Sequence, residues 1–307
     1  MRIEKTYPIE CSPLYRLRNK RKLAELLGVS LIDFRSLCTA GNYNVFLKKE
    51  RGKERLIEHP TKQLEAVHRR IQRLFRRIES PKYLFSGKRH ISSLDNARDH
   101  LGKNHTLTVD IKQFFPHCSD RYIFRFFYSQ MKMSIDVARL LTAIVTYNGH
   151  IPTGSPLSMS ISYWAYSKTF NALYNLAQKN KMKFSLYVDD MTFSSPQPIP
   201  RSFHTSINHQ LRRVGLFLKP SKIHYHSASY HKVVTGSAIS PCGSMKVPNR
   251  IRLKILNRLK ECKNFETADI HLLISIHGSL MSARQIEPHF FESTYRHIKK
   301  AILIRKT

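Results

Sequence analysis

Three aspartates stand out because the chain is poor in acids, with 21 Asp and Glu among 307 residues. Asp189 and Asp190 are adjacent in Tyr187-Val188-Asp189-Asp190, and Asp110 ends a separate apolar run. Half-buried carboxylates need positive partners, which here could be Arg, Lys or a divalent metal. Carboxylates on two strands suit a pair of magnesium ions about 4 Å apart, which can activate a hydroxyl and hold a triphosphate. The plainer interpretation is that these are ordinary turn aspartates.

The elements that must position these acids follow from the pattern of apolar residues. Residues 106–111 predict a short strand that reaches Asp110, and residues 184–193 predict two strands joined by an acidic turn. Because side chains alternate along a strand, Asp189 and Asp190 would point to opposite sides unless the turn bends them. Strands and helices are mixed without strict alternation, which predicts an α+β fold.

Further elements are predicted from helical spacing, caps and turn residues. Gly28 and Gly215 each end a helix, and Ser30 is placed to cap the next one. The predicted elements are helices at 17–28, 31–39, 61–79, 119–130, 134–147 and 203–215, a hairpin at 44–58, a loop at 149–156 followed by a helix to about 179, short strands at 216–218, 223–226 and 231–239, and helices from Pro248 onward.

The charge of the chain points to its class of partner. Lys and Arg number 52, so the net charge is +31. An excess of this size repels itself and favours nucleic acid, since basic side chains release counterions from phosphates. The apolar runs are too short to span a bilayer, and the N-terminus lacks the apolar core of a secretory signal. A generic basic binder of the ribosomal or histone type is the plainer alternative.

The five cysteines are widely spaced and include no CxxC pair, which argues against a disulfide framework and a zinc site. Sixteen histidines are many, but His224, His226 and His231 lie among Lys and Tyr rather than carboxylates. That setting favours surface or RNA-facing roles over metal binding. We therefore expect a cytoplasmic protein in a reducing compartment, with no membrane partner.

Several blocks occur in the order and at the separations of one enzyme family. They are Thr108-Val109-Asp110-Ile111-Lys112-Gln113-Phe114-Phe115, Ile151-Pro152-Thr153-Gly154-Ser155-Pro156-Leu157-Ser158, the Tyr187–Asp190 run, and Gly215-Leu216 followed by Lys222. In this ordered set the chain resembles reverse transcriptases. The resemblance implies that Asp110, Asp189 and Asp190 catalyse with two magnesium ions, for which manganese can substitute in vitro. Phe115 matches the aromatic position that excludes a ribose 2′-OH and so selects deoxynucleotides.

Other positions of these blocks imply contacts with the substrate. Lys222 matches a lysine that donates a proton to the leaving pyrophosphate, and Lys219 is its rival, at a position where Asn is common. Thr153 and Gly154 lie in a loop that packs on the incoming nucleotide and template in the family. Thr153 replaces the usual Gln there. Gly154 permits close backbone approach to substrate, although loop geometry alone could also require a glycine.

Two short motifs narrow the resemblance to the bacterial retron type. Asn96-Ala97-Arg98-Asp99-His100 is similar to an NAxxH signature, and Val234-Thr235-Gly236 is similar to a VTG signature. Asn96 and His100 are expected either to brace the fingers or to contact RNA. Val188 stands where many retron enzymes carry Ala, and it is a familiar variant in other reverse transcriptases.

Basic residues are expected to contact triphosphate and RNA. Residues 55–60 resemble the opening block of the family, which makes Lys53 and Arg55 candidates for the triphosphate. Two basic helices, at 61–79 and from Pro248, favour phosphate contact over solvated charge, and A-form duplex is read in this way through its backbone. The expected RNA-binding residues of these helices are Arg69, Arg73, Arg76, Arg250, Arg252, Lys254 and Arg258.

The resemblance implies a right-hand polymerase fold with fingers, palm and thumb. Residues 1–104 would form N-terminal helices and fingers. Residues 105–245 would form the palm, with a fingers insertion at about 119–150. Residues 246–307 would form a basic helical thumb.

The implied activity is RNA-directed DNA polymerisation from deoxynucleoside triphosphates. A retron enzyme would copy part of a cognate structured non-coding RNA into branched multicopy single-stranded DNA, primed from a guanosine 2′-OH. It would keep the RNA–DNA product bound and act in the bacterial cytoplasm, in anti-phage defence with an effector protein encoded nearby. One alternative is a group II intron type of reverse transcriptase, whose extra regions are not expected in a chain of this length. The other is a catalytically silent RNA-binding scaffold, against which the three aspartates argue.

Overall fold

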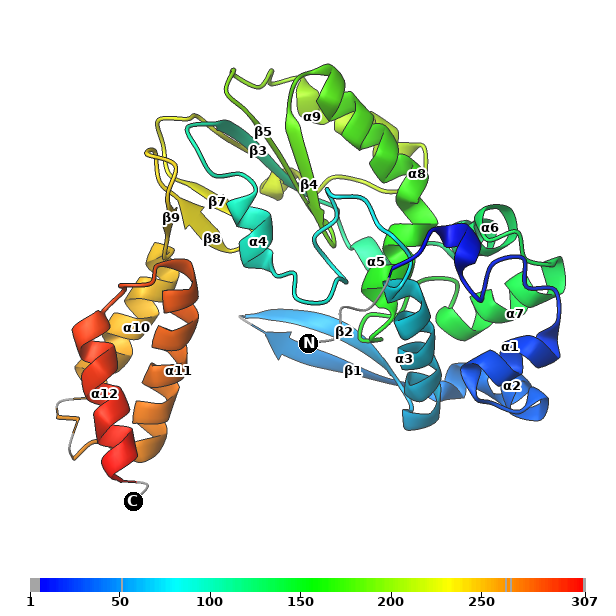
Figure 1. The fold of residues 1–307 in the computed structure, drawn as a ribbon, viewed down its shortest axis with the longest axis horizontal. Coiled ribbons are helices and arrows are strands. Elements are labelled where there is room, and N and C mark those ends of the chain that lie inside the picture. Colours follow the sequence, from blue (N-terminus) through cyan, green and yellow to red (C-terminus); the bar gives the residue numbers. More distant parts are fainter. Residues whose placement is uncertain (1–5, 51, 263, 266, 306–307) are drawn as a thin grey trace. The chain divides into compact units, whose positions relative to one another are not determined.

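The computed structural model describes residues 6–50, 52–262, 264–265 and 267–305, without the side chains of Arg35, Glu50 and Lys53. The chain divides into two compact units, whose elements are labelled in Figure 1. Unit 1 comprises the chain up to Ile91, Thr108–Phe193 and Pro200–Ile223. Unit 2 comprises Ser92–Leu107, Ser194–Ile199 and the chain from His224 onward.

Local caps set the first helices of unit 1. The Asn19 side chain accepts a backbone hydrogen bond at 2.8 Å, and Gly28 adopts a left-handed φ of 69°, so helix α1 covers Lys20–Leu27. It is therefore shorter at its start than the predicted 17–28. Ser30 caps α2 (Leu31–Leu37) as predicted, because its Oγ accepts a backbone hydrogen bond at 3.1 Å.

The predicted hairpin and basic helix follow. Strand β1 (Tyr43–Glu50) pairs antiparallel with β2 (Lys53–Pro60), and Gly52 lies in the turn with a φ of 74°. Helix α3 (Lys62–Arg76) then buries one apolar face at helical spacing. The residues of that face are Leu64, Val67, His68, Ile71, Leu74 and Phe75.

A four-stranded sheet carries the predicted acids. Its strand order is β4-β5-β3-β6, made by β4 (Lys183–Tyr187), β5 (Asp190–Ser195), β3 (His105–Asp110) and β6 (His224–His226). Along the chain, β3 runs from unit 2 into unit 1, and β5 runs from unit 1 into unit 2. Within unit 1, α8 (Ser158–Lys179) packs against β4 and α9 (Phe203–Arg212), as Figure 1 shows.

The other elements of unit 1 are mostly short. They are η1 (Ile9–Cys11), η2 (Ala40–Asn42), α5 (Phe114–His117), α6 (Asp120–Arg125), the π-helix η3 (Phe126–Gln130), α7 (Ile135–Val145), α9 (Phe203–Arg212) and η4 (Pro220–Lys222). The strand predicted at 216–218 is not formed. Leu218 makes only an isolated bridge to Ile111, and its amide donates to the Asn208 side chain at 3.1 Å, which removes it from a ladder.

Unit 2 combines a small sheet with a helical bundle. Helix α4 (Ser93–Arg98) packs on β8 of the sheet β7-β8-β9, formed by β7 (Lys232–Val234), β8 (Ser237–Ile239) and β9 (Met245–Lys246). The single strand predicted at 231–239 is thus two strands. The chain reverses between them because Thr235 and Gly236 have left-handed φ values of 43° and 86°.

Three helices lie side by side at the C-terminal end of unit 2 (Figure 1). They are α10 (Asn249–Glu261), α11 (Ile270–Ile286) and α12 (Glu292–Ile304). Their shared core includes Ile255, Leu273, Ile276, Leu280 and Ile298, all buried. Within the described part of the chain, no helix has both the length and the apolarity to cross a membrane.

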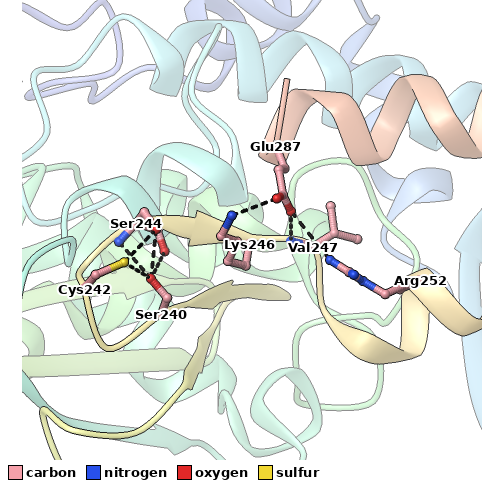
Figure 2. A network of polar contacts seen from close by, with 7 residues as sticks. All are labelled: Ser240, Cys242, Ser244, Lys246, Val247, Arg252 and Glu287. Carbon is pink, nitrogen blue, oxygen red and sulfur yellow. Dashed lines mark hydrogen bonds and ion pairs between the residues drawn. The ribbon is translucent and has the colours of Figure 1, made fainter. Parts of the chain in front are cut away.

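Figure 2 shows the polar network that joins β9 to this bundle. Glu287, at the end of α11, accepts from Lys246 Nζ at 2.8 Å and from the Val247 amide at 3.2 Å. Arg252 of α10 lies 4.0 Å from the same carboxylate. One acidic side chain therefore fixes the segment that leads into α10 against the end of α11.

Candidate active site

The turn that carries Asp189 has a strained backbone, and a residue outside the hairpin holds it by a hydrogen bond. Val188 has a φ of 61°, which a β-branched residue rarely adopts and which costs about 1–3 kcal/mol. Its amide donates to Ser86 Oγ at 3.0 Å. The buried side chains of β4 and β5 anchor the strands on both sides of this turn. The chain thus presents Asp189 and Asp190 on a hairpin whose geometry depends on Ser86.

The structure brings Asp110 to this hairpin. The Ile111 amide donates to the Asp189 carbonyl at 3.1 Å, and the Lys219 amide donates to the Asp110 carbonyl at 2.9 Å. The end of β3, the acidic turn and the segment before η4 are therefore joined through their backbones. All three belong to unit 1.

The three carboxylates perturb one another. Burial, and then the charges of Asp110 and Asp190, raise the pKa of Asp189 to about 7. Burial and the charge of Asp110 raise the pKa of Asp190 to about 6. Burial also raises the pKa of Asp110, against the opposing charge of nearby cations. At neutral pH this cluster therefore carries negative charge that its own surroundings do not fully compensate.

The donor set suits a divalent cation in its chemistry. Hard carboxylate oxygens are the ligands that magnesium prefers, and a cation would relieve the mutual repulsion of Asp110, Asp189 and Asp190. Among the described residues, however, no three His, Cys, Asp or Glu side chains form a ready-made metal-binding group. A bound ion would have to draw the carboxylates closer together, with substrate phosphates supplying further oxygens.

Three cations face the carboxylates. Lys222, at the end of η4, lowers the pKa of both Asp110 and Asp190, whereas Lys219 acts on Asp110 alone. Arg55 of β2 lowers the pKa of Asp110 and Asp189, which brings the predicted triphosphate residue to the cluster. Lys53 begins β2, but its side chain lies outside the described part of the chain. Lys222 thus acts on two of the three carboxylates and Lys219 on one, which favours Lys222 as the proton donor.

Phe114 and Phe115 divide their roles on α5. Phe114 is buried against Tyr166 and Phe170, with ring centroids 6.4 Å and 6.2 Å away. Phe115 is only half-buried, and its ring centroid lies 5.7 Å from that of Phe114. The core role therefore falls to Phe114, and Phe115 remains able to face a substrate.

The loop of Thr153 and Gly154 is fastened to β2. The Glu58 amide donates to the Thr153 carbonyl at 2.7 Å, and the Thr153 amide donates to the Glu58 carboxylate at 2.9 Å. A Cβ at Gly154, which has a φ of 131°, would lie 3.0 Å from Ile57 Cγ2 and 3.3 Å from the Glu58 carbonyl oxygen. Packing on β2 therefore requires this glycine in the structure itself.

Glu58 is a site residue that sequence reasoning missed. Its side chain is almost completely buried, and its carboxylate lies 2.9 Å from His150 Nε2. It thus joins β2, the bridge at His150 and the predicted nucleotide loop at Thr153. No local signal distinguishes Glu58 from Glu50 and Glu54 in the same part of the sequence, because its partners lie more than 90 positions away.

The two shorter motifs form one unit in unit 2. The Asn96 amide nitrogen donates to Thr235 Oγ1 at 3.3 Å, and Thr235 Oγ1 donates to the Ser93 carbonyl at 2.7 Å. Ala97 and Val234 pack in the same small core, which contains Ile239 as well. The motif residues, 139 positions apart along the chain, therefore hold α4 against the β7–β8 turn.

Burial changes the expectation for Asn96 and His100. Both side chains are 0% exposed, and His100 Nδ1 lies 2.7 Å from Ser194 Oγ. A side chain that is enclosed in this way cannot reach RNA without opening the fold. This geometry does not allow the predicted RNA contact by Asn96 and His100. It fits the alternative expectation, in which these side chains brace the fold.

The predicted basic faces are partly occupied by internal contacts. Arg69 of α3 pairs with Glu65 at 2.5 Å, whereas Arg73 is exposed and Arg76 half-buried. On α10, Arg258 donates to Ser275 Oγ at 2.7 Å, and Arg252 lies over the Phe290 ring at 5.3 Å. Arg73, Arg250 and Lys254 are exposed, and their side chains make no such internal contact within the described part of the chain.

The family profile described as "Reverse transcriptase (RNA-dependent DNA polymerase)" matches residues 47–239, which include the carboxylates, Arg55, Lys222 and both short motifs. The chain belongs to the reverse transcriptase family. Retron Se72 reverse transcriptase of Salmonella heidelberg (strain 579083-10) is 32% identical over 197 residues, 60% of this chain and 50% of that protein. Retron Ec86 reverse transcriptase of Escherichia coli is 25% identical over 234 residues, 73% of this chain and 72% of that protein.

These relatives confirm the resemblance to the bacterial retron type. The chain spans about half the length of the Se72 reverse transcriptase. Among solved structures, apo telomerase from Candida tropicalis matches with a TM-score of 0.54 at 11% identity, over 78% of this chain and 52% of that chain. So low an identity concerns the fold alone. Together with the family, it confirms the predicted α+β fold of the right-hand polymerases.

Proposed function

We propose that this reverse transcriptase copies part of a cognate structured non-coding RNA into DNA, as an RNA-directed DNA polymerase of the retron type. The observation that carries the proposal is the cluster of Asp110, Asp189 and Asp190. The charge of Asp110 raises the pKa of both Asp189 and Asp190, and Arg55 and Lys222 lie within electrostatic reach of the cluster. Such a cluster is suited to phosphoryl transfer, where catalysis consists mainly of positioning and charge stabilisation.

In the proposed mechanism Asp110, Asp189 and Asp190 would hold two magnesium ions, which would supply activation of the attacking hydroxyl and charge stabilisation for the leaving pyrophosphate. Arg55 binds the triphosphate of the incoming deoxynucleotide. Lys222, whose ammonium group faces Asp110 and Asp190, donates a proton from Nζ to the pyrophosphate. Phe115 excludes a ribose 2′-OH from the nucleotide site.

The proposed division of the chain follows the right-hand polymerase. Residues 1–104 supply N-terminal helices and fingers, and residues 105–245 supply the palm, with the 119–150 segment inserted. Residues 246–307 supply a thumb, in which exposed Arg250 and Lys254 contact the phosphates of the RNA–DNA product. The net charge of +31 supports a nucleic acid as the partner of the chain.

The retron assignment adds finer proposals. DNA synthesis starts from a guanosine 2′-OH of the cognate RNA, and the product is branched multicopy single-stranded DNA. The enzyme acts in the bacterial cytoplasm, in anti-phage defence, together with an effector protein. The motif pair at Asn96 and Thr235 and the similarity to retron reverse transcriptases support these proposals.

Primer extension tests the polymerase activity. The purified protein, an RNA template, a DNA primer, deoxynucleotides and magnesium should give full-length DNA. The Asp189→Ala plus Asp190→Ala variant should give none above background. If wild type and this variant are equally inactive with a natively folded protein, the proposed activity is refuted.

Expression beside the native locus tests the retron type. Small DNA covalently joined to RNA should accumulate, and treatment with a debranching enzyme should release the two strands. Exclusively unbranched products would refute 2′-OH priming while leaving the polymerase activity intact.

A further inference from the structure

Unit 1 contains a cavity that is lined by none of the sequence motifs described above. It is a cavity of about 650 Å³ between the end of α2 with η2, the start of β1, and helices α6 and α7. None of the residues assigned to catalysis or to the triphosphate lines it. Its size falls in the range of sites that hold one small ligand, about 300–1,000 Å³.

Two exposed guanidinium groups lie at this cavity. Arg121 comes from α6 and Arg139 from α7. Within the described part of the chain, neither guanidinium makes an ion pair or a hydrogen bond, unlike Arg69 and Arg258. Two unpaired guanidiniums at the mouth of one cavity suit a phosphate group, which Arg can bind through parallel hydrogen bonds.

Aromatic rings form another part of the lining. Tyr43 and Tyr147 lie with ring centroids 4.7 Å apart, and Tyr43 Oη donates to the Thr146 carbonyl at 3.5 Å. Phe124 is partly exposed, and its ring stacks on that of Tyr128, with centroids 5.6 Å apart and an interplanar angle of 10°. Rings that are held by neighbours in this way offer rigid faces on which a nucleobase can stack.

A single acidic side chain completes the lining. Asp120 accepts a hydrogen bond from Ser119 Oγ at 3.2 Å, and its amide donates to the Gly149 carbonyl at 2.9 Å. The exposed Asn148 lies beside it in the lining. A carboxylate and an amide can pair with the amino and imino groups on the edge of a base.

We propose that this cavity binds one unpaired nucleotide, with its phosphate on Arg121 and Arg139 and its base against Phe124 and Tyr147. An apolar ligand would leave both guanidiniums without partners, and an inorganic anion would use neither the rings nor Asp120. A nucleoside phosphate uses all three kinds of lining group. It can come from a single-stranded stretch of RNA or from a free nucleotide.

The cavity wall continues into the loop that carries Thr153. Tyr147 and His150 exchange both backbone hydrogen bonds, at 2.9 Å and 3.0 Å. His150 lies 2.9 Å from the buried Glu58, which in turn accepts from the Thr153 amide at 2.9 Å. A nucleotide stacked on Tyr147 would therefore steady a segment that is bonded to the proposed nucleotide loop.

Site-specific photocrosslinking tests the proposal. A single-stranded RNA decamer with one 4-thiouridine, added without magnesium or deoxynucleotides, should cross-link to peptides that contain Phe124 or Tyr147. Arg121→Gln and Arg139→Gln should each lower that yield by roughly tenfold, since each removes charge-assisted hydrogen bonds to phosphate. Arg125→Gln is the matched control, because Arg125 is exposed on the same helix but does not line the cavity.

Competition identifies the source of the nucleotide. If millimolar guanosine monophosphate abolishes the cross-link, the cavity takes free nucleotides; if only unlabelled single-stranded RNA does, it takes an RNA strand. The proposal is overturned if no cross-link maps to the lining, or if Arg121→Gln and Arg125→Gln behave alike. Because the assay includes no polymerisation, failure of the polymerase activity would leave its result unaffected.

Discussion

Asp189 in unit 1 and Asn96 in unit 2 both belong to short sequence motifs, but their surroundings differ. Asp189 is half-buried among carboxylates that raise its pKa to about 7. Asn96 is fully enclosed, and its amide nitrogen donates to Thr235 Oγ1. The first environment stores unfavourable charge that a ligand can relieve, and the second holds two segments together. A motif can therefore mark chemistry in one unit and architecture in the other.

The largest expected effect comes from removing one charge of the carboxylate cluster. Asp189→Asn should lower the rate of DNA synthesis by at least about 10²–10³-fold, because charge stabilisation at the reacting phosphate is lost. The melting temperature should stay equal or rise, since the repulsion from Asp110 and Asp190 is relieved. Primer extension and thermal melting measure the two effects.

Asp136→Asn is the control for that substitution. Asp136 is an exposed acid on α7, and the change should leave synthesis within about twofold of wild type. If the Asp189→Asn variant is active, or melts well below wild type, the proposed difference between the environments of Asp189 and Asn96 is contradicted.

The next effect separates the two lysines near the cluster. Lys222→Gln should lower the rate constant for nucleotide addition by roughly 10²-fold, the usual contribution of a general acid. Lys219→Gln should lower it by less than about threefold, because Lys219 acts on Asp110 alone. Single-turnover measurements of the rate constant for nucleotide addition in the two variants would check this. The reverse order would assign the proton to Lys219.

A smaller effect is expected in unit 2, and on stability rather than rate. Asn96→Ala should lower the free energy of unfolding by about 1–3 kcal/mol, because it removes the hydrogen bond to Thr235 Oγ1 and leaves a cavity in place of a fully buried side chain. Thr235→Val should cost about 1 kcal/mol, and the two substitutions should couple by roughly 0.5 kcal/mol or more in a double-mutant cycle. Urea denaturation measures all three. Thr235→Ser, which keeps the hydroxyl, should retain the coupling, and strict additivity would contradict the hydrogen bond.

The smallest effect is the dependence of stability on pH and magnesium. The folded protein holds the protons of Asp189 and Asp190 more tightly than the unfolded chain, so it gains stability at low pH. That stability is present below an unfolded pKa of about 4 and is lost as pH rises through about 6 to 7. Relative to Asp189→Asn plus Asp190→Asn, wild type should therefore melt a few degrees lower at pH 8 than at pH 5.

Magnesium should reverse this difference at pH 8 and have little effect at pH 5, where protons already occupy the cluster. Differential scanning fluorimetry with and without the ion measures both. An equal effect of magnesium on wild type and on the double Asn variant would show that the ion binds elsewhere.

The cluster of acids was predictable because each acid marks its own element. Asp110 ends an apolar strand and Asp189 lies at the turn between two others, and the resemblance to reverse transcriptases implied that these acids act together. The hairpin around Gly52 and the C-terminal helices were also predictable, because local patterns of apolar, basic and turn residues mark them. In contrast, the link from Ser86 to Val188 spans 102 positions, and no local pattern announces it. The turn at Thr235 was missed because β-branched residues rarely adopt its left-handed φ.

The NAxxH and VTG motifs show the same limit from another side. The sequence shows that both motifs are present, but it does not show that they contact each other. The hydrogen bond between Asn96 and Thr235 depends on how α4 packs on β8. Burial decided between the two roles considered for Asn96 and His100. Only a three-dimensional structure supplies burial for a polar residue in a short helix.

The turn between β8 and β9 offers a practical consequence (Figure 2). Cys242 is exposed there, and hydrogen bonds from Ser240 and Ser244 lower the pKa of its thiol to about 7. Cys118 and Cys262 are buried, and burial raises the pKa of Cys38. A maleimide dye at neutral pH should therefore react with Cys242 ahead of these three thiols, since the thiolate is the nucleophile. In a Cys11→Ser variant, Cys242 would therefore carry a fluorescent reporter beside the Glu287 network, and its signal could be followed as RNA is added.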